Sequence, residues 1–331
     1  MYNSSVTNWQ PRSGPTTGGT RVRVYGFFAN TGAARAAFGA AVLPCAYVSD
    51  REVDCPSPVA AVAGGVPMSV CVDDASVWSP LWVPVGQFQY YEPPQLAAIA
   101  PPLGPLSGAT SVVVSGAGFV GTPDAILVSL TSGDGGGAGT VRGTLSGSTV
   151  TFFTPPFLRS RRGLLAVEVA LNGQQFTATS PPVLFTMYAD PVIASVVPPF
   201  SPVRGGATVV LLGGVFVDTP TRDYVRVRIT SVSTGAVSTA PATVVDNGTL
   251  VFATTAGAAG DAVLSVSLNA QNYAPSTGSL ARYARDANLH FPCAPPCRRM
   301  QRVCGTCPGT HRPCRPGWRA RARPPSGIGR Q

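Results

Sequence analysis

One pattern of glycine, threonine and aromatic residues occurs three times along this 331-residue chain, at intervals of roughly 90 to 100 residues. A Gly-rich triplet comes before a short apolar strand in each copy: Gly18-Gly19-Thr20, Gly108-Ala109-Thr110 and Gly206-Ala207-Thr208. Each triplet is followed by a glycine and then an aromatic residue: Gly26 and Phe28, Gly116 and Phe119, Gly214 and Phe216. Each copy closes on a similar ending: Phe88-x-x-Tyr91, Phe185-x-x-Tyr188 and Leu280-x-x-Tyr283. The repetition indicates three copies of one domain, so function has to be argued for an array rather than for a single catalytic body.

The chain favours β-structure throughout. It contains 37 Gly and 33 Pro, and its apolar residues occur in short runs between Pro, Gly and Asn. None of these runs has the spacing of an amphipathic helix. In Arg21–Val24 the two valines alternate with arginines, and Val225–Ile229 repeats this alternation in the third copy. The sequence therefore predicts an all-β chain with almost no helix.

A later strand of each copy predicts how the sheets pack. Apolar residues alternate along it before a turn-forming Asp or Asn: Met68, Val70, Val72 and Asp73; Val167, Val169, Leu171 and Asn172; Leu264, Val266, Leu268 and Asn269. The residues between them are expected on the outer face: Ser69, Cys71, Glu168, Ala170, Ser265 and Ser267. One-sided alternation favours two antiparallel sheets packed face to face.

The charge distribution excludes several classes of function. The formal net charge is +9, but residues 1–284 contain 14 Arg and 14 acidic residues, whereas residues 285–331 contain 10 Arg and one Asp. Nucleic-acid binding by the repeats is therefore not expected. Both histidines, His290 and His311, lie outside the repeats, so no Ser-His-Asp arrangement can form within one, and the chain has no Lys for a phosphate-binding loop. The sequence predicts a protein that is not an enzyme, with no catalytic residue and no cofactor.

The segments Pro11–Phe28 and Ala37–Val42, followed by Cys45 and by Val53–Pro58, form a distinctive series in the first copy. This series resembles the start of an IPT/TIG domain, the immunoglobulin-like domain of plexins, related receptors and some transcription factors, and Thr154-Pro155-Pro156 lies at the matching place in the second copy. The resemblance implies three tandem immunoglobulin-like (E-set) β-sandwiches and an irregular Cys- and Arg-rich C-terminal tail. The expected parts are residues 1–92 with an incomplete first strand, 93–189, 190–284 and the tail 285–331.

The resemblance also implies a disulfide between Cys45 and Cys55, which flank a segment with the pattern of a hairpin, Val48–Val53. Two buried thiols are an alternative, and so is a Cys55–Cys71 pair. In the tail, Cys304, Cys307, His311 and Cys314 offer four zinc ligands, with spacings shorter than those of a zinc knuckle. A truncated disulfide-rich module and a disordered end are the other interpretations of the tail, and no metal site is expected elsewhere.

Two sequons predict glycosylation candidates at Asn3 and Asn247, and Asn247-Gly248 also favours an exposed hairpin turn. Arg159-Ser160-Arg161-Arg162 fits a processing protease of the furin type, with a solvated loop as the alternative. No apolar run reaches 18 residues, so no membrane span is expected. The first residues lack the features of a secretory signal and begin within the repeat pattern, so we expect either a piece of a longer protein or an incomplete gene model.

We therefore expect a non-catalytic array that serves as spacer and interaction segment of a larger extracellular or cell-surface protein of the adhesion or receptor type. Its partners would be proteins, with glycans as a second class of ligand, bound through loops or outer sheet faces. One alternative is an intracellular IPT/TIG or filamin-like module in a transcription factor or cytoskeletal scaffold. Another is an accessory spacer of a carbohydrate-active enzyme.

Overall fold

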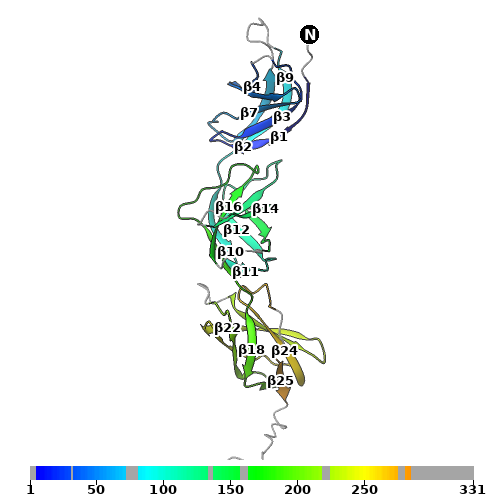
Figure 1. Cartoon of the computed structure of the whole chain (residues 1–331), viewed down its shortest axis with the longest axis vertical. Helices are drawn as coiled ribbons and strands as arrows, with labels where there is room; N and C mark the ends of the chain where they lie inside the picture. The colour runs from blue at the N-terminus through cyan, green and yellow to red at the C-terminus, as the bar shows by residue number, and fades with distance from the viewer. Residues whose placement is uncertain are drawn as a thin grey trace, which may run out of the picture. The chain divides into compact units, whose positions relative to one another are not determined.

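The computed structural model describes residues 5–30, 33–71, 81–132, 137–156, 163–217, 224–274 and 280–284. The described residues contain no α-helix, and their strands form three β-sandwiches that follow one another along the chain (Figure 1). All three lie within one compact unit, Met1–Ala287. The all-β fold predicted from the sequence is confirmed.

The first sandwich has two sheets, with strand orders β1-β3-β7-β6 and β2-β9-β8-β4-β5. Its strands are β1 (Ser5–Gln10), β2 (Ser13–Pro15), β3 (Arg21–Phe27), β4 (Arg35–Phe38), β5 (Ala41–Pro44), β6 (Ala46–Ser49), β7 (Glu52–Pro56), β8 (Gly64–Cys71) and β9 (Val83–Tyr91). Neighbouring strands are antiparallel, except that β2 runs parallel to β9. The predicted hairpin between Cys45 and Cys55 is present as β6 and β7.

The second and third sandwiches share one strand order with each other, β10-β12-β15-β14-β13-β16-β17-β11 and β18-β20-β23-β22-β21-β24-β25-β19. The strands of the second are β10 (Gln95–Ala100), β11 (Leu103–Pro105), β12 (Ser111–Ala117), β13 (Leu127–Ser132), β14 (Gly137–Ser146), β15 (Thr149–Phe153), β16 (Gly163–Ala170) and β17 (Leu184–Tyr188). Those of the third are β18 (Val192–Val197), β19 (Phe200–Pro202), β20 (Thr208–Gly214), β21 (Arg226–Ser231), β22 (Val237–Asp246), β23 (Thr249–Ala253), β24 (Gly260–Ser267) and β25 (Leu280–Ala284).

One strand of each sandwich passes from one layer to the other. β14 pairs with both β13 and β15, and β22 pairs with both β21 and β23, so the two layers are joined through a single ten-residue strand. In the first sandwich the same path is divided into β5 and β6, which are separated by Cys45. The cysteine therefore lies at the point where the chain crosses between sheets.

At the end of the first strand of each sandwich, the chain passes to the other sheet. β1, β10 and β18 pair with β3, β12 and β20, and each ends directly before a proline, Pro11, Pro101 or Pro198, that follows a cis peptide bond. The chain continues as β2, β11 and β19, which pair in parallel with the last strand of the same sandwich. Because the first strand ends early, the beginning of β3, β12 and β20 has no neighbour on that side within its own sandwich.

Alternating apolar side chains fill the interior of each sandwich, as the sequence predicted. Val22 and Val24 of β3 are fully buried while the two flanking arginines are exposed, and Val227 and Ile229 are buried in β21. The three aromatic residues that follow the strand glycines are also in the core: Phe28, Phe119 and Phe216.

The structure corrects the alignment of the third copy by one residue. Gly205, not Gly206, corresponds to Gly18 and Gly108, because each of these three has a positive φ and lies so close to a neighbouring backbone that a Cβ would overlap it. The later glycine of this copy is likewise Gly213 rather than Gly214, since a Cβ at Gly213 would overlap the carbonyl oxygen of Val192. The sequence pattern slipped because the third copy has a second Gly-Gly pair and Ala207 in place of a threonine.

The structure also corrects the expected outer faces of β8, β16 and β24. Ser69, Glu168 and Ser265 are partly exposed, but the last outward residue of each strand is buried: Cys71, Ala170 and Ser267. In the second and third sandwiches the chain folds back beside the strand end, where the amides of Thr177 and Ala274 donate to Val169 and Val266. That returning segment covers the end of the strand.

Candidate interaction sites

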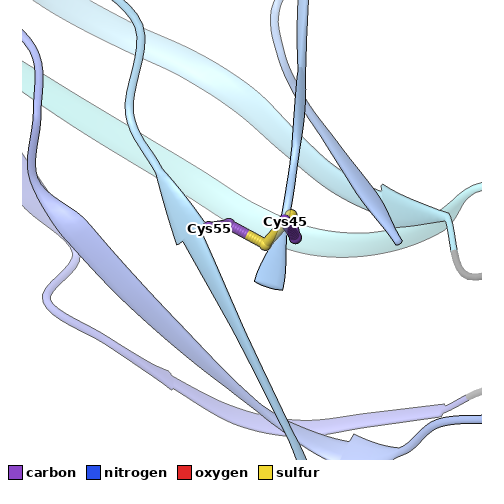
Figure 2. The surroundings of a disulfide bond; sticks show 2 residues. All are labelled: Cys45 and Cys55. Carbon is purple, nitrogen blue, oxygen red and sulfur yellow. A yellow bond between two sulfur atoms is a disulfide. The ribbon is translucent and has the colours of Figure 1, made fainter. Parts of the chain in front are cut away.

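The disulfide of the first sandwich lies at the crossing between its two sheets (Figure 2). Cys45, between β5 and β6, is bonded to Cys55 of β7, with their Cα atoms 4.4 Å apart. The amide of Cys45 donates to the carbonyl of Ala34 at 2.8 Å, and Cys55 is completely buried. The bond therefore ties the divided crossing strand to the neighbouring sheet. This is the pairing that the family resemblance implied.

Cys71 does not take part in this bond. It is buried at the end of β8, opposite Arg35 of β4, rather than on the outer face where the alternation placed it. The alternative Cys55–Cys71 pairing is therefore not the one adopted.

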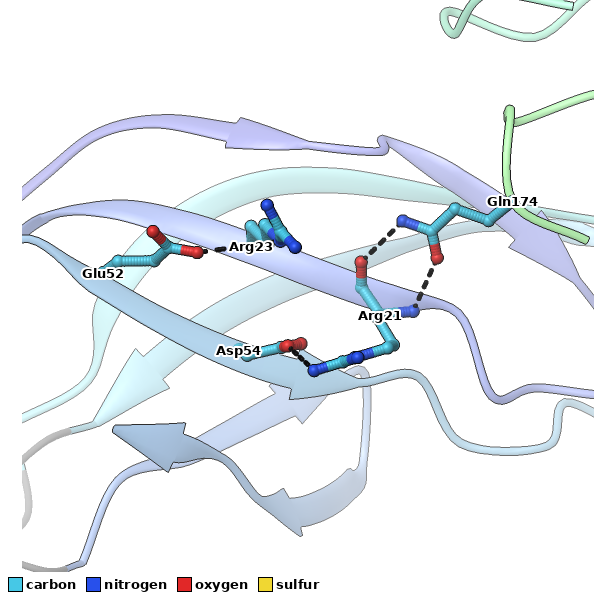
Figure 3. A network of polar contacts seen from close by, with 5 residues as sticks. All are labelled: Arg21, Arg23, Glu52, Asp54 and Gln174. Carbon is cyan, nitrogen blue, oxygen red and sulfur yellow. Dashed lines mark hydrogen bonds and ion pairs between the residues drawn. The ribbon is translucent and has the colours of Figure 1, made fainter. Parts of the chain in front are cut away.

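The outer face of β3 and β7 carries two ion pairs (Figure 3). Arg21 Nη2 contacts Asp54 Oδ2, and Arg23 Nε lies 3.6 Å from Glu52 Oε1. The Asp54 side chain is only 7% exposed, whereas that of Arg21 is 71% exposed. Both pairs run diagonally across the strands, because Arg23 is directly opposite Asp54 in the ladder.

The same face is neutral in the other two sandwiches. At the places of Arg21, Arg23 and Asp54 the second sandwich has Ser111, Val113 and Thr151, and the third has Thr208, Val210 and Val251. Sequence reasoning placed the arginines in solvent but missed their partners, because Glu52 and Asp54 lie on a strand whose register is fixed by the fold. The first sandwich thus has a charged outer face that its neighbours lack.

The first sandwich also has two cation–π contacts. Arg12 lies 5.6 Å from the centroid of the Trp9 ring, and Arg51 lies 4.4 Å from that of Phe27. Trp9 is 7% exposed and packs against Gly86, whereas Phe27 is 50% exposed. Phe27 is therefore the aromatic surface in this area that a partner can reach.

Asn247 occupies the turn between β22 and β23 and is exposed, as the Asn-Gly pair predicted. The amide of Gly248 donates to Asp246 Oδ1 at 2.8 Å, which supports this turn. Asn3, the Arg159–Arg162 cluster, both histidines and the zinc candidates Cys304, Cys307, His311 and Cys314 lie outside the described residues.

Three buried tyrosines have a raised pKa. Burial raises the pKa of Tyr90 to about 12, against a smaller lowering by a hydrogen bond with Ser57. Burial also raises the pKa of Tyr91 and of Tyr188, with a further contribution from the charge of Asp124 or Asp190. A phenol with a raised pKa stays neutral, so none of these groups is an activated base or nucleophile.

No group of three or more His, Cys, Asp or Glu residues is placed to hold a metal ion in the part of the chain that the structure describes. Nor does any helix among the described residues have the length and apolar character needed to cross a membrane.

Comparison with known proteins agrees with the fold. Residues 191–283 match the model of the IPT/TIG domain family. A stretch of 118 residues is 34% identical to plexin-A2 of Mus musculus and to plexin-A2 of Homo sapiens, and it represents 35% of this chain and 6% of each relative. The chain therefore spans a small part of the curated relatives that it matches.

Solved structures with a similar fold share little sequence identity with this chain. A structure of the full extracellular region of plexin A4 is 17% identical, with a TM-score of 0.43 over 86% of this chain and 24% of that chain. The FN1-FN3 domains of chicken CNTN1 are 9% identical, with a TM-score of 0.30 over 82% of this chain and 96% of that chain. The family match of residues 191–283 and the common design of the three sandwiches support a tandem array of IPT/TIG-type domains.

Proposed function

We propose that this protein is a non-catalytic array that spaces and presents interaction surfaces within a larger extracellular or cell-surface protein of the receptor or adhesion type. The Cys45–Cys55 disulfide is the observation that carries the proposal, because such bonds persist in oxidising compartments and are rare in the cytosol. The identity with plexin-A2 supports the same assignment.

The absence of catalysis is part of this proposal. In the described residues Asp54 and Glu52 of the first sandwich are engaged by arginines, and the tyrosines with a raised pKa are buried and neutral. The family to which residues 191–283 belong supports an interaction role as well. The work of the chain would then be done by its surfaces.

Protein partners would bind outer sheet faces that differ from one sandwich to the next. The charged face of Arg21, Arg23, Glu52 and Asp54, with the exposed ring of Phe27 beside it, favours a partner with its own charged residues around an apolar centre. The neutral face of the second sandwich, where Phe153 is 66% exposed, favours a more apolar partner.

The remaining sequence predictions belong to this proposal. The domains would comprise residues 1–92, 93–189 and 190–284, followed by the tail 285–331. Asn247 would be glycosylated, because its exposed turn leaves room for a glycan.

Peptide mapping without reduction tests the compartment. Trypsin cleaves after Arg35, Arg51 and Arg142, so a Cys45–Cys55 bond links peptide 36–51 to peptide 52–142, and cyanogen bromide cleavage after Met68 then separates Cys55 from Cys71. Protein taken from its producing cells, with free thiols blocked at lysis, should give peptide 36–51 joined to 52–68. Recovery of both cysteines as blocked thiols would contradict the extracellular assignment.

A further inference from the structure

The first two sandwiches each leave one residue of a strand edge open. β1 pairs with β3 only as far as Gln10 opposite Arg23, so Arg21, at the start of β3, lies beyond the end of its neighbour. In the second sandwich β10 ends at Ala100 opposite Val113, which leaves Ser111 in the same position. We call the backbone groups of Arg21 and Ser111 the open edges. Backbone N–H and C=O groups at such an edge need partners.

A glutamine of the following sandwich fills each open edge. Gln174 Nε2 donates to the carbonyl of Arg21 at 2.9 Å, and the amide of Arg21 donates back to Gln174 Oε1 at 3.0 Å (Figure 3). Gln271 makes the same two bonds with Ser111, at 2.9 and 3.0 Å. One side-chain amide thus replaces the missing residue of the first strand, since it offers the same donor and acceptor as a peptide group.

Each glutamine is presented by a turn built around a buried asparagine. Asn172 Oδ1 accepts from the amides of Gln174 and Gln175, and Asn269 Oδ1 accepts from those of Gln271 and Asn272. We call residues 172–175 and 269–272 the docking turns. Because the asparagine fixes the turn before contact, little further ordering is needed for the glutamine to meet the open edge.

The asparagines themselves also reach the preceding sandwich. Asn172 Nδ2 donates to the carbonyl of Ser13 at 3.0 Å, and Asn269 Nδ2 donates to that of Leu103 at 3.3 Å. They are 5% and 1% exposed. The docking turn 172–175 therefore makes three hydrogen bonds to backbone groups of its neighbour. The docking turn 269–272 makes five, since Asn272 Nδ2 also donates to the carbonyls of Gly108 and Ala109.

The tyrosine that ends each of the first two sandwiches makes the reciprocal contact. Tyr91 packs in the apolar core of the second sandwich and is 2% exposed. Tyr188 packs in the core of the third together with Leu103 and is 1% exposed. Apolar burial and directional hydrogen bonds thus meet at both junctions.

We propose that the docking turn is a recognition element whose partner is the open edge of the preceding sandwich, and that this recognition holds consecutive sandwiches in a fixed orientation. The partner chemistry is a strand edge with one unpaired N–H and C=O, met by a turn of the form Asn-x-Gln. At the open edges the bonded groups are backbone atoms, so the residues there can differ, as Arg21 and Ser111 do. The hydroxyls of the preceding residues, Thr20 and Thr110, also donate to the docking turns. The proposal is independent of the compartment in which the protein acts.

Hydrogen exchange in the full chain tests the recognition, with the two junctions as controls for each other. Gln174→Ala should raise the exchange rate of the Arg21 amide about tenfold while leaving that of Ser111 unchanged, and Gln271→Ala should do the reverse. Gln174→Glu keeps the acceptor for the Arg21 amide but cannot donate to its carbonyl, so it should still weaken the junction. Unchanged exchange of Arg21 in Gln174→Ala would overturn the proposal.

Small-angle X-ray scattering tests the fixed orientation. The double variant Gln174→Ala/Gln271→Ala should give a broader distribution of interatomic distances than the wild-type chain, because the sandwiches would then move more freely about their linkers. Retained strand-core protection in the exchange data would establish that the variant is folded. A scattering curve identical to that of the wild type would refute the claim that docking turns set the orientation.

Discussion

Removal of the Cys45–Cys55 bond should destabilise the first sandwich by an amount that the loop length sets. The two cysteines are ten residues apart, and a cross-link that closes a loop of this size lowers the entropy of the unfolded chain enough to stabilise the fold by about 2.7 kcal/mol. Cys55 is fully buried in β7, so the variant Cys45→Ala/Cys55→Ala also loses some packing, and its total loss should somewhat exceed about 2.7 kcal/mol.

Tryptophan fluorescence during urea unfolding isolates this effect, because three of the four tryptophans, Trp9, Trp78 and Trp82, precede the second sandwich and the fourth, Trp318, lies in the tail. With a urea dependence of about 1–3 kcal/mol per molar, the midpoint should fall by roughly 1–3 M. The control is wild-type protein with a reductant, which should reproduce most of the shift without any substitution.

The reasoning fails if reduction leaves the midpoint unchanged. A second comparison uses Cys71→Ala, which removes a buried thiol of the same sandwich but no cross-link. Its unfolding should remain sensitive to reductant. Loss of that sensitivity in Cys71→Ala would mean that Cys71 forms the functional disulfide.

Asp54→Asn should cost about 1 kcal/mol of sandwich stability and Glu52→Gln close to none, since Asp54 is almost buried against Arg21 whereas Glu52 and Arg23 are more exposed; the same urea titration measures both. Gly205→Ala should destabilise the third sandwich by more than about 2 kcal/mol, because its Cβ would lie 2.5 Å from the carbonyl carbon of Thr255. Gly206→Ala should cost about 1 kcal/mol, because a Cβ at Gly206 meets open space and the equivalent Ala109 already has a positive φ. Hydrogen exchange of the β20 amides measures the stability of both variants. A larger loss in Gly206→Ala than in Gly205→Ala would restore the alignment that the sequence suggested. Raising the pH from 10 to 12 should destabilise the first sandwich, because the pKa of Tyr90 is about 12 in the folded state and 10 in the unfolded state. The stability that the neutral Tyr90 phenol contributes is complete below pH 10 and is lost as the folded phenol ionises. Tyr90→Phe should reduce this loss when the free energy of unfolding is measured against pH.

Much of the fold could be predicted because it follows from local patterns. Alternation in Arg21–Val24 identified a strand with one buried face, and Asn247-Gly248 identified a turn. The error at Gly205 arose because the third copy has Gly-Gly pairs at 205–206 and 213–214 and Ala207 in place of a threonine, so its sequence allows two alignments. The close approach of the Thr255 backbone to Gly205 and of Val192 to Gly213 distinguishes them. The burial of Cys71 could not be predicted from the alternation within β8. In the matching strands β16 and β24, a segment that returns beside the strand covers the equivalent position.

The charged face could not be predicted, because its partners meet through register rather than sequence spacing. Asp54 is 33 residues from Arg21, and nothing in either segment specifies that β3 and β7 are neighbours. The register of β3 and β7 brings Arg21 next to Asp54 and Arg23 next to Glu52, so each exposed arginine forms an ion pair. The fold therefore adds the specificity that the residue types alone lack.

The junctions show why side-chain recognition of backbone suits an array whose surfaces must vary. Gln174 and Gln271 contact only the N–H and C=O of Arg21 and Ser111, so the side chain at each open edge is left for other uses. The guanidinium of Arg21 forms an ion pair with Asp54, while Ser111 belongs to a neutral face. Because Gln174 and Gln271 bond to the backbone of the open edge, the side chain at that edge can change its charge without any change in these hydrogen bonds. For the same reason the residue at the open edge carries no sequence signal. In further sequences the junction could be recognised by the Asn-x-Gln turn on the donor side and by the threonine before the open edge, since the hydroxyls of Thr20 and Thr110 donate to the docking turns.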